Sequence, residues 1–403
     1  MRMMCKILSV FVMIAFCMIS TGCVFAAESH VSKVVKVVNE FAFKTANLLM
    51  KDSDASSGSD LFFSPFSIIS AFGMVYAGAN AQTAQEMRNS LGFSDSLHEN
   101  LGELVKEISC EALRNANRVW LDHDVKLLQD YELLLKKYYD SDTGLVKFTQ
   151  NPNEAREIIN SWVSRSTHNR IKDLIRKIEP DTRMILTNAV YFNAKWADAF
   201  DKNLTKKRPF KNAATEPIEV DMMSKTDNFS YGEVDGAKVI RIPYGVDGHN
   251  FAMLAVLPPE NVEMNAFLSG VNQDLFSRWI SSLSRRKVDL WLPKFRTEKR
   301  YELSDIFKKL GVQAAFTDHA DFSGITSAED LKIDSIIHQS FIELDEEKTE
   351  AAAATAVQMM RVTSARPMKV EIKQFHADRP FAYFIIDDNS GVILFMGKQS
   401  FRE

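Results

Sequence analysis

The chain has 403 residues, and 49 Lys and Arg nearly balance 53 Asp and Glu, which leaves a net charge of −4. This balance argues against a nucleic-acid-binding protein, which should carry a basic surface stripe. A hydrophobic content of 46% with only 16 Gly and 11 Pro is typical of a globular chain and argues against low-complexity or collagen-like sequence.

The N-terminal segment has the pattern of a secretory signal peptide. Arg2 and Lys6 precede an apolar run over residues 7–19, which is too short to span a membrane. Small residues near Ala26 suit cleavage after that position. We therefore expect residues 1–26 to be removed during export, which places the mature protein outside the cell or in a periplasm.

The cysteines bear on the same segment. Cys23 follows Gly22, which leaves bacterial lipid modification as an alternative, although Ser20 stands where that pattern requires an apolar residue. Cys110 is the one cysteine that lies well beyond the signal. We therefore expect no internal disulfide, and a fold that is stabilised by its core.

The remaining chain predicts helices early and strands late. Ser64 followed by Pro65 is a helix start, with Ser as the cap and Pro at the first position. Because βαβ alternation is absent, the pattern favours one α+β domain over residues 27–403. We expect helices at 31–50, 65–78, 154–177 and 301–310, and strands at 184–196, within 239–257 (two), at 288–295, 381–386 and 392–397.

Motifs of enzymes and cofactor sites are missing from the sequence. GxSxG, HExxH, GxGxxG, CxxC and Walker patterns do not occur, and the eight His are scattered singly. We therefore predict no enzymatic activity, no metal and no cofactor. Two basic clusters, 206–208 and 285–287, are interpreted as solvated loop charges rather than as a polyanion site.

One segment is compatible with more than one conformation. Residues 345–360 read DEEKTEAAAATAVQMM, and no charge follows Glu350 within that stretch. The Ala run favours helix or a flexible linker. As a strand, however, the segment would present one small or apolar, uncharged face that could be buried in a sheet. A segment of this kind suits a conformational switch. That face consists of Thr349, Ala351, Ala353, Thr355, Val357 and Met359.

Five motifs, in order, resemble those of the serpins. The resemblance covers nearly the whole mature chain and includes the Ala-rich segment, which resembles the hinge of inhibitory serpins. The motifs are LFFSPFSI at 61–68, TNAVYFNAKW at 187–196, LGV at 310–312 with ADFSGI at 320–325, TEAAAATA at 349–356, and FHADRPF at 375–381.

Similarity to serpins implies a fold of three β-sheets and about nine helices, with an exposed reactive loop over about residues 346–374. It implies a suicide-type inhibitor of serine endopeptidases, extending in some members to cysteine endopeptidases. The partner is the target endopeptidase, held as a covalent acyl complex after the cleaved loop inserts into the main sheet. We expect a monomer that binds no nucleic acid.

The resemblance also assigns roles to residues. Ser64, Ser67, Asn188 and His338 match the shutter beneath the opening sheet, and Trp196 matches the breach where insertion begins. From the residues alone, Ser64 is a helix cap, His338 a core or surface histidine, and Trp196 a core aromatic. The hinge comprises Thr349, Glu350, Ala351, Ala352, Ala353 and Ala354.

One position departs from the family pattern, and the reactive bond has alternatives. Lys348 stands where the inhibitory hinge usually has Gly, which would pivot more freely. Counting from Thr349 places the reactive bond at Val362-Thr363, with Arg361 as the runner-up. Counting back from Pro380 gives Arg366, but the following Pro367 blocks most proteases. Because Lys348 departs from the inhibitory pattern, a non-inhibitory carrier, chaperone or storage role is the alternative function.

Overall fold

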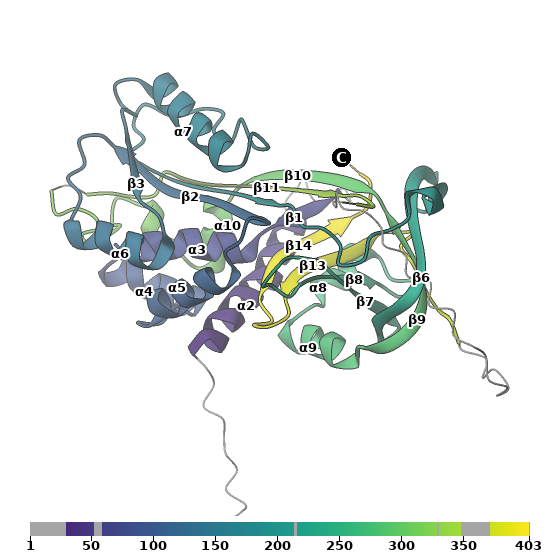
Figure 1. Cartoon of the computed structure of the whole chain (residues 1–403). Coiled ribbons are helices and arrows are strands. Elements are labelled where there is room, and N and C mark those ends of the chain that lie inside the picture. Colours follow the sequence, from purple (N-terminus) through teal and green to yellow (C-terminus); the bar gives the residue numbers. More distant parts are fainter. Residues whose placement is uncertain (1–29, 52–58, 213–215, 329, 348–370, 403) are drawn as a thin grey trace, which may run out of the picture.

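The computed structural model describes residues 30–402 except 52–58, 213–215, 329 and 348–370 (Figure 1). The predicted signal peptide, hinge and reactive bond therefore lie outside the described residues. The described part contains nine α-helices and fourteen strands, which confirms the α+β class. None of these helices is both long and apolar enough to cross a membrane.

The smaller sheet has five strands in the order β10-β11-β4-β2-β3. The helix α7 (Pro152–Ser166) covers one face, and the helix α3 (Pro65–Tyr76) lies against the other (Figure 1). Every residue of β4 is consequently buried. The strand bounds are Phe295–Glu302 for β10, Ser335–Leu344 for β11, Met184–Phe192 for β4, Leu113–Asp122 for β2 and Thr143–Val146 for β3.

The larger sheet has nine strands in the order β1-β14-β13-β8-β7-β6-β9-β12, with β5 also paired to β6. Two of the three expected sheets join here, because the 17-residue strand β6 pairs with β5 and β9 along one part and with β7 at its end. The bounds are Leu61–Phe63 (β1), Ile393–Gln399 (β14), Phe381–Asp387 (β13), Phe251–Leu257 (β8), Ala237–Pro243 (β7), Ile218–Val234 (β6), Ser284–Pro293 (β9), Lys373–His376 (β12) and Lys206–Phe210 (β5).

The helices pack around these sheets. The helix α3 contacts β14 as well as β2 and β4, so all of its residues are buried and most of them are apolar. Its start is as predicted, because the Ser64 Oγ accepts a hydrogen bond from the Ser67 amide at 3.1 Å. The other helices are α2 (His30–Lys51), α4 (Ala81–Leu91), α5 (Leu97–Ile108), α6 (Gln129–Tyr139), α8 (Met264–Ser269), α9 (Gln273–Ser282) and α10 (Ser304–Leu310).

Four predicted boundaries were wrong. The strand expected over 288–295 is β9, which begins at Ser284 and ends at Pro293. The helix expected over 154–177 ends at Ser166, because His168 and Asn169 adopt positive φ values of 49° and 60° that a helix cannot contain. The strand expected over 184–196 ends at Phe192. The helix expected from residue 301 begins at Ser304, since residues 301 and 302 complete β10. The hairpin of β13 and β14 and the paired strands within 239–257 are confirmed.

Candidate functional site

The centre of the five-stranded sheet is a seam between two parallel strands. Over eight residue pairs β11 lies beside β4, and His338 stands opposite Asn188. Parallel pairing is slightly weaker per residue than antiparallel pairing. The chain leaves β11 at Leu344, so a segment that folded back into the seam would run antiparallel to both strands. The seam is therefore a place where an added strand would improve the pairing on both sides.

A cluster of polar side chains, here called the shutter cluster, lies beneath the seam. The His338 Nε2 accepts a hydrogen bond from the Ser64 amide at 3.2 Å, so its Nδ1 carries the proton and donates to the Asn188 Oδ1. The Asn188 Nδ2 in turn donates to the Ser67 carbonyl at 3.1 Å and to the Asn117 Oδ1. These bonds join β11, β4, β2 and α3. The cluster consists of Ser64, Ser67, Asn117, Asn188 and His338.

Burial determines the protonation state of His338, the one titratable side chain in this cluster. His338 has no exposed surface. Burial lowers its pKa to about 3, although the bond with Asn188 opposes the shift, and the imidazole is neutral at physiological pH. The neutral ring can donate on one side and accept on the other, as the two observed bonds require.

The structure brings together all four residues that the resemblance assigned to the shutter; their functional role stays a prediction. Asn117 was missed. It lies opposite Asn188 in the antiparallel pair of β2 and β4. An Asn inside a strand is a weak signal, and only the strand register shows that it meets the other four residues.

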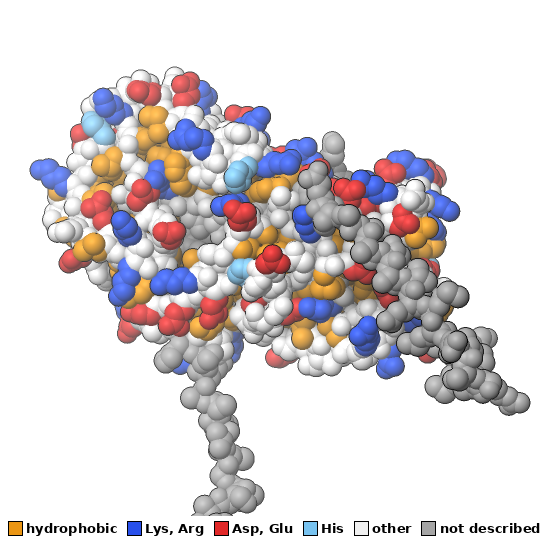
Figure 2. Space-filling view, in the orientation of Figure 1, with side chains coloured by type: hydrophobic (Ala, Val, Ile, Leu, Met, Phe, Trp, Pro, Cys, Tyr) orange, Lys and Arg blue, Asp and Glu red, His pale blue; other side chains and the backbone are white. Residues whose placement is uncertain are grey.

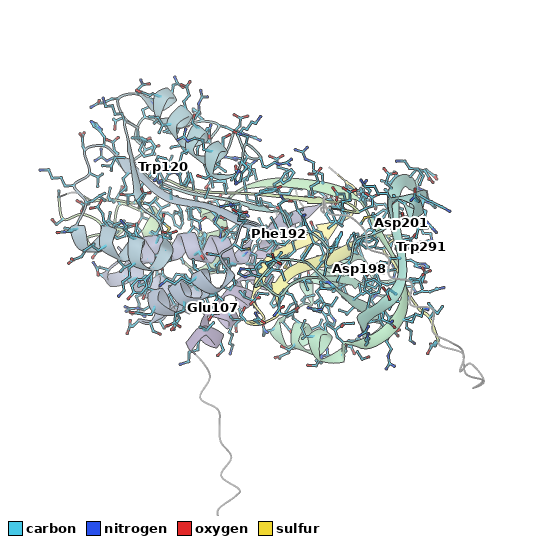
Figure 3. All side chains as sticks on the ribbon, viewed as in Figure 1. Glu107, Trp120, Phe192, Asp198, Asp201 and Trp291 are labelled. Carbon is cyan, nitrogen blue, oxygen red and sulfur yellow. The ribbon has the colours of Figure 1, made fainter. Side chains whose placement is uncertain are left out.

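The segment that leaves β11 is docked next to Trp196. The Trp196 Nε1 donates to the Asp345 carbonyl at 2.9 Å, and its ring stacks on Tyr244 with centroids 4.6 Å apart. Trp196 is 5% exposed, which confirms the predicted core aromatic, while its role as the breach stays a prediction. Figure 3 labels Phe192 at the end of β4, with Asp198 and Asp201 in the segment after it.

The next two residues are held by ion pairs. Glu346, which is 4% exposed, pairs with Lys294 at 2.8 Å and accepts a hydrogen bond from the Thr205 Oγ1 at 2.7 Å. Burial alone would raise the pKa of Glu346, but these two hydrogen bonds outweigh burial and lower it. Lys202 pairs with Glu347. These contacts, which fix the chain immediately before Lys348, were not predicted from the sequence.

The C-terminal end of the predicted reactive loop, about residue 374, lies in the strand β12. This edge strand pairs only with β9 in the described part of the chain, over four residues. The His376 Nε2 lies 2.8 Å from the Asp289 Oδ2, and its ring stacks on Trp291 at 3.7 Å. Arg208 lies 3.5 Å from the same indole ring. A row of side chains thus joins β12, β9 and β5 across the sheet, with Trp291 labelled in Figure 3.

The basic clusters lie on strands rather than in the loops that were expected. Residues 206–208 begin β5, and 285–287 belong to β9. All are exposed except the half-buried Arg208. On the face that Figure 2 shows, acidic and basic side chains are interspersed rather than gathered into one charged area.

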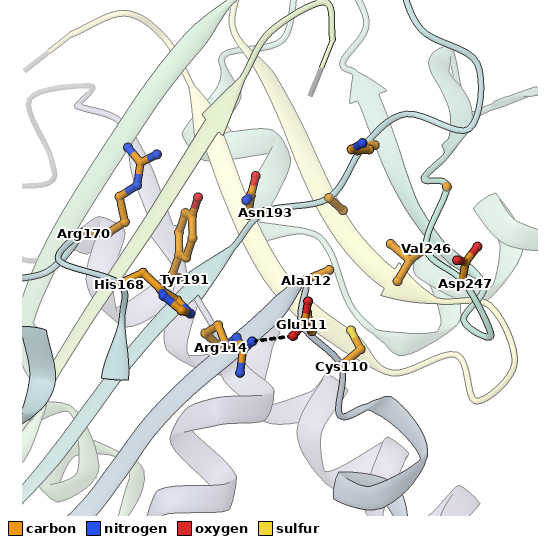
Figure 4. Close-up of a pocket in the computed structure, with 13 residues that line it drawn as sticks. Cys110, Glu111, Ala112, Arg114, His168, Arg170, Tyr191, Asn193, Val246 and Asp247 are labelled. Atoms are coloured by element: carbon orange, nitrogen blue, oxygen red, sulfur yellow. Dashed lines mark hydrogen bonds and ion pairs between the residues drawn. The ribbon is translucent and has the colours of Figure 1, made fainter. Parts of the chain in front are cut away.

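A cavity of about 1090 Å³ opens beside the end of β4 (Figure 4). Tyr191 and Cys110 are among the residues that line it. Two of its basic side chains are paired, since Arg114 lies 3.3 Å from Glu111 and Arg170 lies 3.8 Å from Glu343, a residue of β11. Charge in this cavity is thus partly compensated.

Comparison with known proteins gives a consistent result. Residues 36–400 match the model of the family described as serpin (serine protease inhibitor). An uncharacterized serpin-like protein of Methanosarcina mazei is 39% identical, over 91% of this chain and 86% of its own length. Human thyroxine-binding globulin in complex with thyroxine superimposes with a TM-score of 0.80 at 27% identity, covering 92% of this chain and 98% of its own. The thermophilic serpin tengpin in its native state gives 0.80 at 27% identity, covering 91% and 93%.

Proposed function

The chain belongs to the serpin family, and from that premise we propose that it is an exported suicide inhibitor of serine endopeptidases. The target's serine attacks the Val362 carbonyl, an ester forms, and the bond to Thr363 breaks with release of its amine. The freed N-terminal arm then inserts between β4 and β11 while still esterified to the protease. Inhibition requires insertion to precede hydrolysis of the ester.

The seam between β4 and β11 is the observation that carries this proposal. It is parallel and central, and the chain that leaves β11 continues into residues 351–360, which carry no charge. From Thr349 to Val362 there are 13 steps, so a fully extended arm spans roughly 43 Å at about 3.3 Å per residue. An arm of that reach would carry an attached protease from one end of the sheet toward the other.

Insertion of the loop requires the hydrogen bonds across the seam between β4 and β11 to break. Because His338 and Asn188 are directly opposite across the seam, parting the strands at this point must break their hydrogen bond. Of the remaining shutter bonds, the one from the Ser64 amide to His338 links β11 to the start of α3, and the others lie within β4, β2 and α3. The Glu346–Lys294 pair holds the base of the arm until that opening.

Mixing the protein with trypsin-like and elastase-like proteases tests the proposal. We expect an acyl complex that survives boiling in SDS, and mass spectrometry of the released peptide should place the cut at Val362-Thr363 or after Arg361. Thr349→Arg is the matched variant, since it would bury an unpaired charge during insertion. It should be cleaved at the same bond without forming the complex. Equal trapping by both proteins would refute the hinge assignment.

A non-inhibitory carrier role is the second candidate. Lys348 in place of the usual Gly restricts the pivot, and thyroxine-binding globulin, which shares this fold, was solved with thyroxine bound. Thermal unfolding before and after cleavage of the loop separates the two functions. Insertion should raise the melting temperature, whereas equal melting temperatures would favour the carrier role.

A further inference from the structure

The seam between β4 and β11 carries a pair of facing aromatic rings on its outer side. Tyr191 of β4 stands opposite Phe341 of β11 in the strand register, and their ring centroids are 5.5 Å apart. Successive side chains of a strand point to opposite faces of the sheet. Both rings therefore lie on the face opposite His338 and Asn188, which is the face that packs against α7.

One cation contacts both of these rings. The Arg170 guanidinium lies 5.6 Å from the ring centroid of Tyr191 and 5.7 Å from that of Phe341 (Figure 4). A cation within about 6 Å of a ring centroid is attracted by the ring face. The Arg170 Nη1 also lies 3.8 Å from the Glu343 Oε2, on β11. Arg170 therefore joins the two strands of the seam, and Arg170, Tyr191 and Phe341 are here called the clasp.

The turn after α7 holds Arg170 in this position. Thr167, which follows the last residue of α7, is fully buried. Its Oγ1 accepts a hydrogen bond from the Ile171 amide at 3.2 Å, across a turn that contains two left-handed residues, His168 and Asn169. Ile171 is also fully buried, so Arg170 stands between two anchored neighbours. The turn that ends α7 thus directs the chain so that Arg170 lies over the seam.

The clasp lies nearer than the shutter cluster to the end at which the chain leaves β11. The pair of Tyr191 and Phe341 is three register positions beyond the pair of Asn188 and His338, in the direction of Leu344. An arm that enters the seam from that end would meet the clasp first. The Arg170 side chain is 43% exposed, and cation–π contacts of such side chains are weak. Contacts of this strength delay opening of the seam without preventing it.

We propose that Arg170 is a positioning residue that holds the outer face of the seam closed and thereby sets how fast the cleaved loop inserts. This rests on the proposed function, since only an inserting loop requires the seam to open. Slower insertion leaves more time for hydrolysis of the ester to the protease. The clasp therefore also sets the fraction of protease molecules that escape.

A synthetic peptide with the sequence of residues 349–362 measures opening of the seam without a protease. The fluorescently labelled peptide is mixed in excess with the uncut chain from Ala27 onward, and its incorporation is followed by size-exclusion chromatography. Arg170→Met removes the charge but keeps a long side chain. It should take up the peptide about fivefold faster than the wild type, as expected for the loss of weak cation–π contacts. Arg170→Lys should be intermediate, because an ammonium group keeps the charge but cannot stack as a planar guanidinium does.

Arg296→Met is the matched control. The Arg296 guanidinium lies 4.8 Å from the centroid of the same Phe341 ring, but it comes from β10, on the side of β11 away from the seam. The control therefore loses a cation–π contact without loosening the seam, and it should take up the peptide at the wild-type rate. Urea unfolding shows that each variant folds and how much stability it has lost. Equal acceleration in Arg296→Met and Arg170→Met would assign the effect to general destabilisation and overturn the clasp.

Trapping of a protease links the clasp to inhibition. Arg170→Met should lower the number of inhibitor molecules consumed per protease trapped, while mass spectrometry finds the same cut bond. A wild type that takes up the peptide and traps protease, beside an Arg170→Met variant that takes it up no faster, would overturn the clasp and leave the proposed function. A wild type that neither takes up the peptide nor forms a complex that survives SDS would contradict the proposed function, and the clasp with it.

Discussion

Replacing His338 should make the free energy of unfolding of this protein less sensitive to acid. The ring is fully buried and makes two hydrogen bonds as a neutral imidazole. Burial lowers its pKa from an ordinary 6.5 to about 3. His338→Gln keeps a side chain that can donate and accept, but it removes the titrating group.

The sign and size follow from proton linkage. Between about pH 6.5 and pH 3 the unfolded chain binds a proton at this position and the folded chain does not, so stability falls as the pH falls. The loss is about 1.4 kcal/mol per pH unit, or about 2 kcal/mol on going from pH 7 to pH 5. Above pH 6.5 both states are neutral and the contribution is constant.

Urea unfolding at pH 7 and pH 5 measures this loss in the wild type and in His338→Gln. The wild type should lose about 2 kcal/mol more than the variant over this interval. His98, whose pKa is also lowered by burial, remains in both proteins and cancels in the comparison. Equal losses, or a His338 C2 proton that titrates above pH 5 in NMR spectra of the unmodified protein, would refute the reasoning.

Three further expectations concern the loop and its base. A double-mutant cycle of Glu346→Gln and Lys294→Met should give a coupling of about 1–3 kcal/mol in urea unfolding, below a fully buried pair because Lys294 is partly exposed. Because the pKa of Glu346 is lowered, this coupling should persist below the pH at which an ordinary Glu is protonated, and it should be lost only when Glu346 itself takes up a proton. Lys348→Gly should bring the measured stoichiometry of inhibition closer to one, and a higher value would show that Lys348 assists insertion. Inhibition assays should find that Val362→Ala weakens action on elastase-like enzymes and Arg361→Ala on trypsin-like ones.

Local sequence predicted those features that depend on near neighbours. Ser64 and Pro65 predicted the start of α3, and the turn residues between β13 and β14 predicted their hairpin, because capping and turn chemistry act within a few residues. The helix over 154–177 failed at His168 and Asn169. Their backbone is left-handed, and the segment that follows buries Ile171 and Ile175 outside any helix.

Contacts between distant segments could not be predicted from local sequence. The pairing of Glu346 with Lys294, and of Asn117 with Asn188, depends on which strands become neighbours and in what register. The resemblance to the serpins recovered four shutter residues, three of them within the quoted motifs and His338 outside them, since it carries information from related chains. Asn117 was outside the quoted motifs and was found only in the structure.

The position of the last two strands has a consequence for how the protein is made. Strands β13 and β14 lie between β8 and β1, and Lys398 stands opposite Leu61. A chain still attached to the ribosome therefore lacks the two strands that connect β1 to the rest of the larger sheet until synthesis is nearly finished. Such distant contacts form slowly, because a long stretch of chain must be ordered before they stabilise it. Loss of even the final twenty or so residues should thus leave an aggregation-prone chain rather than a slightly shortened inhibitor.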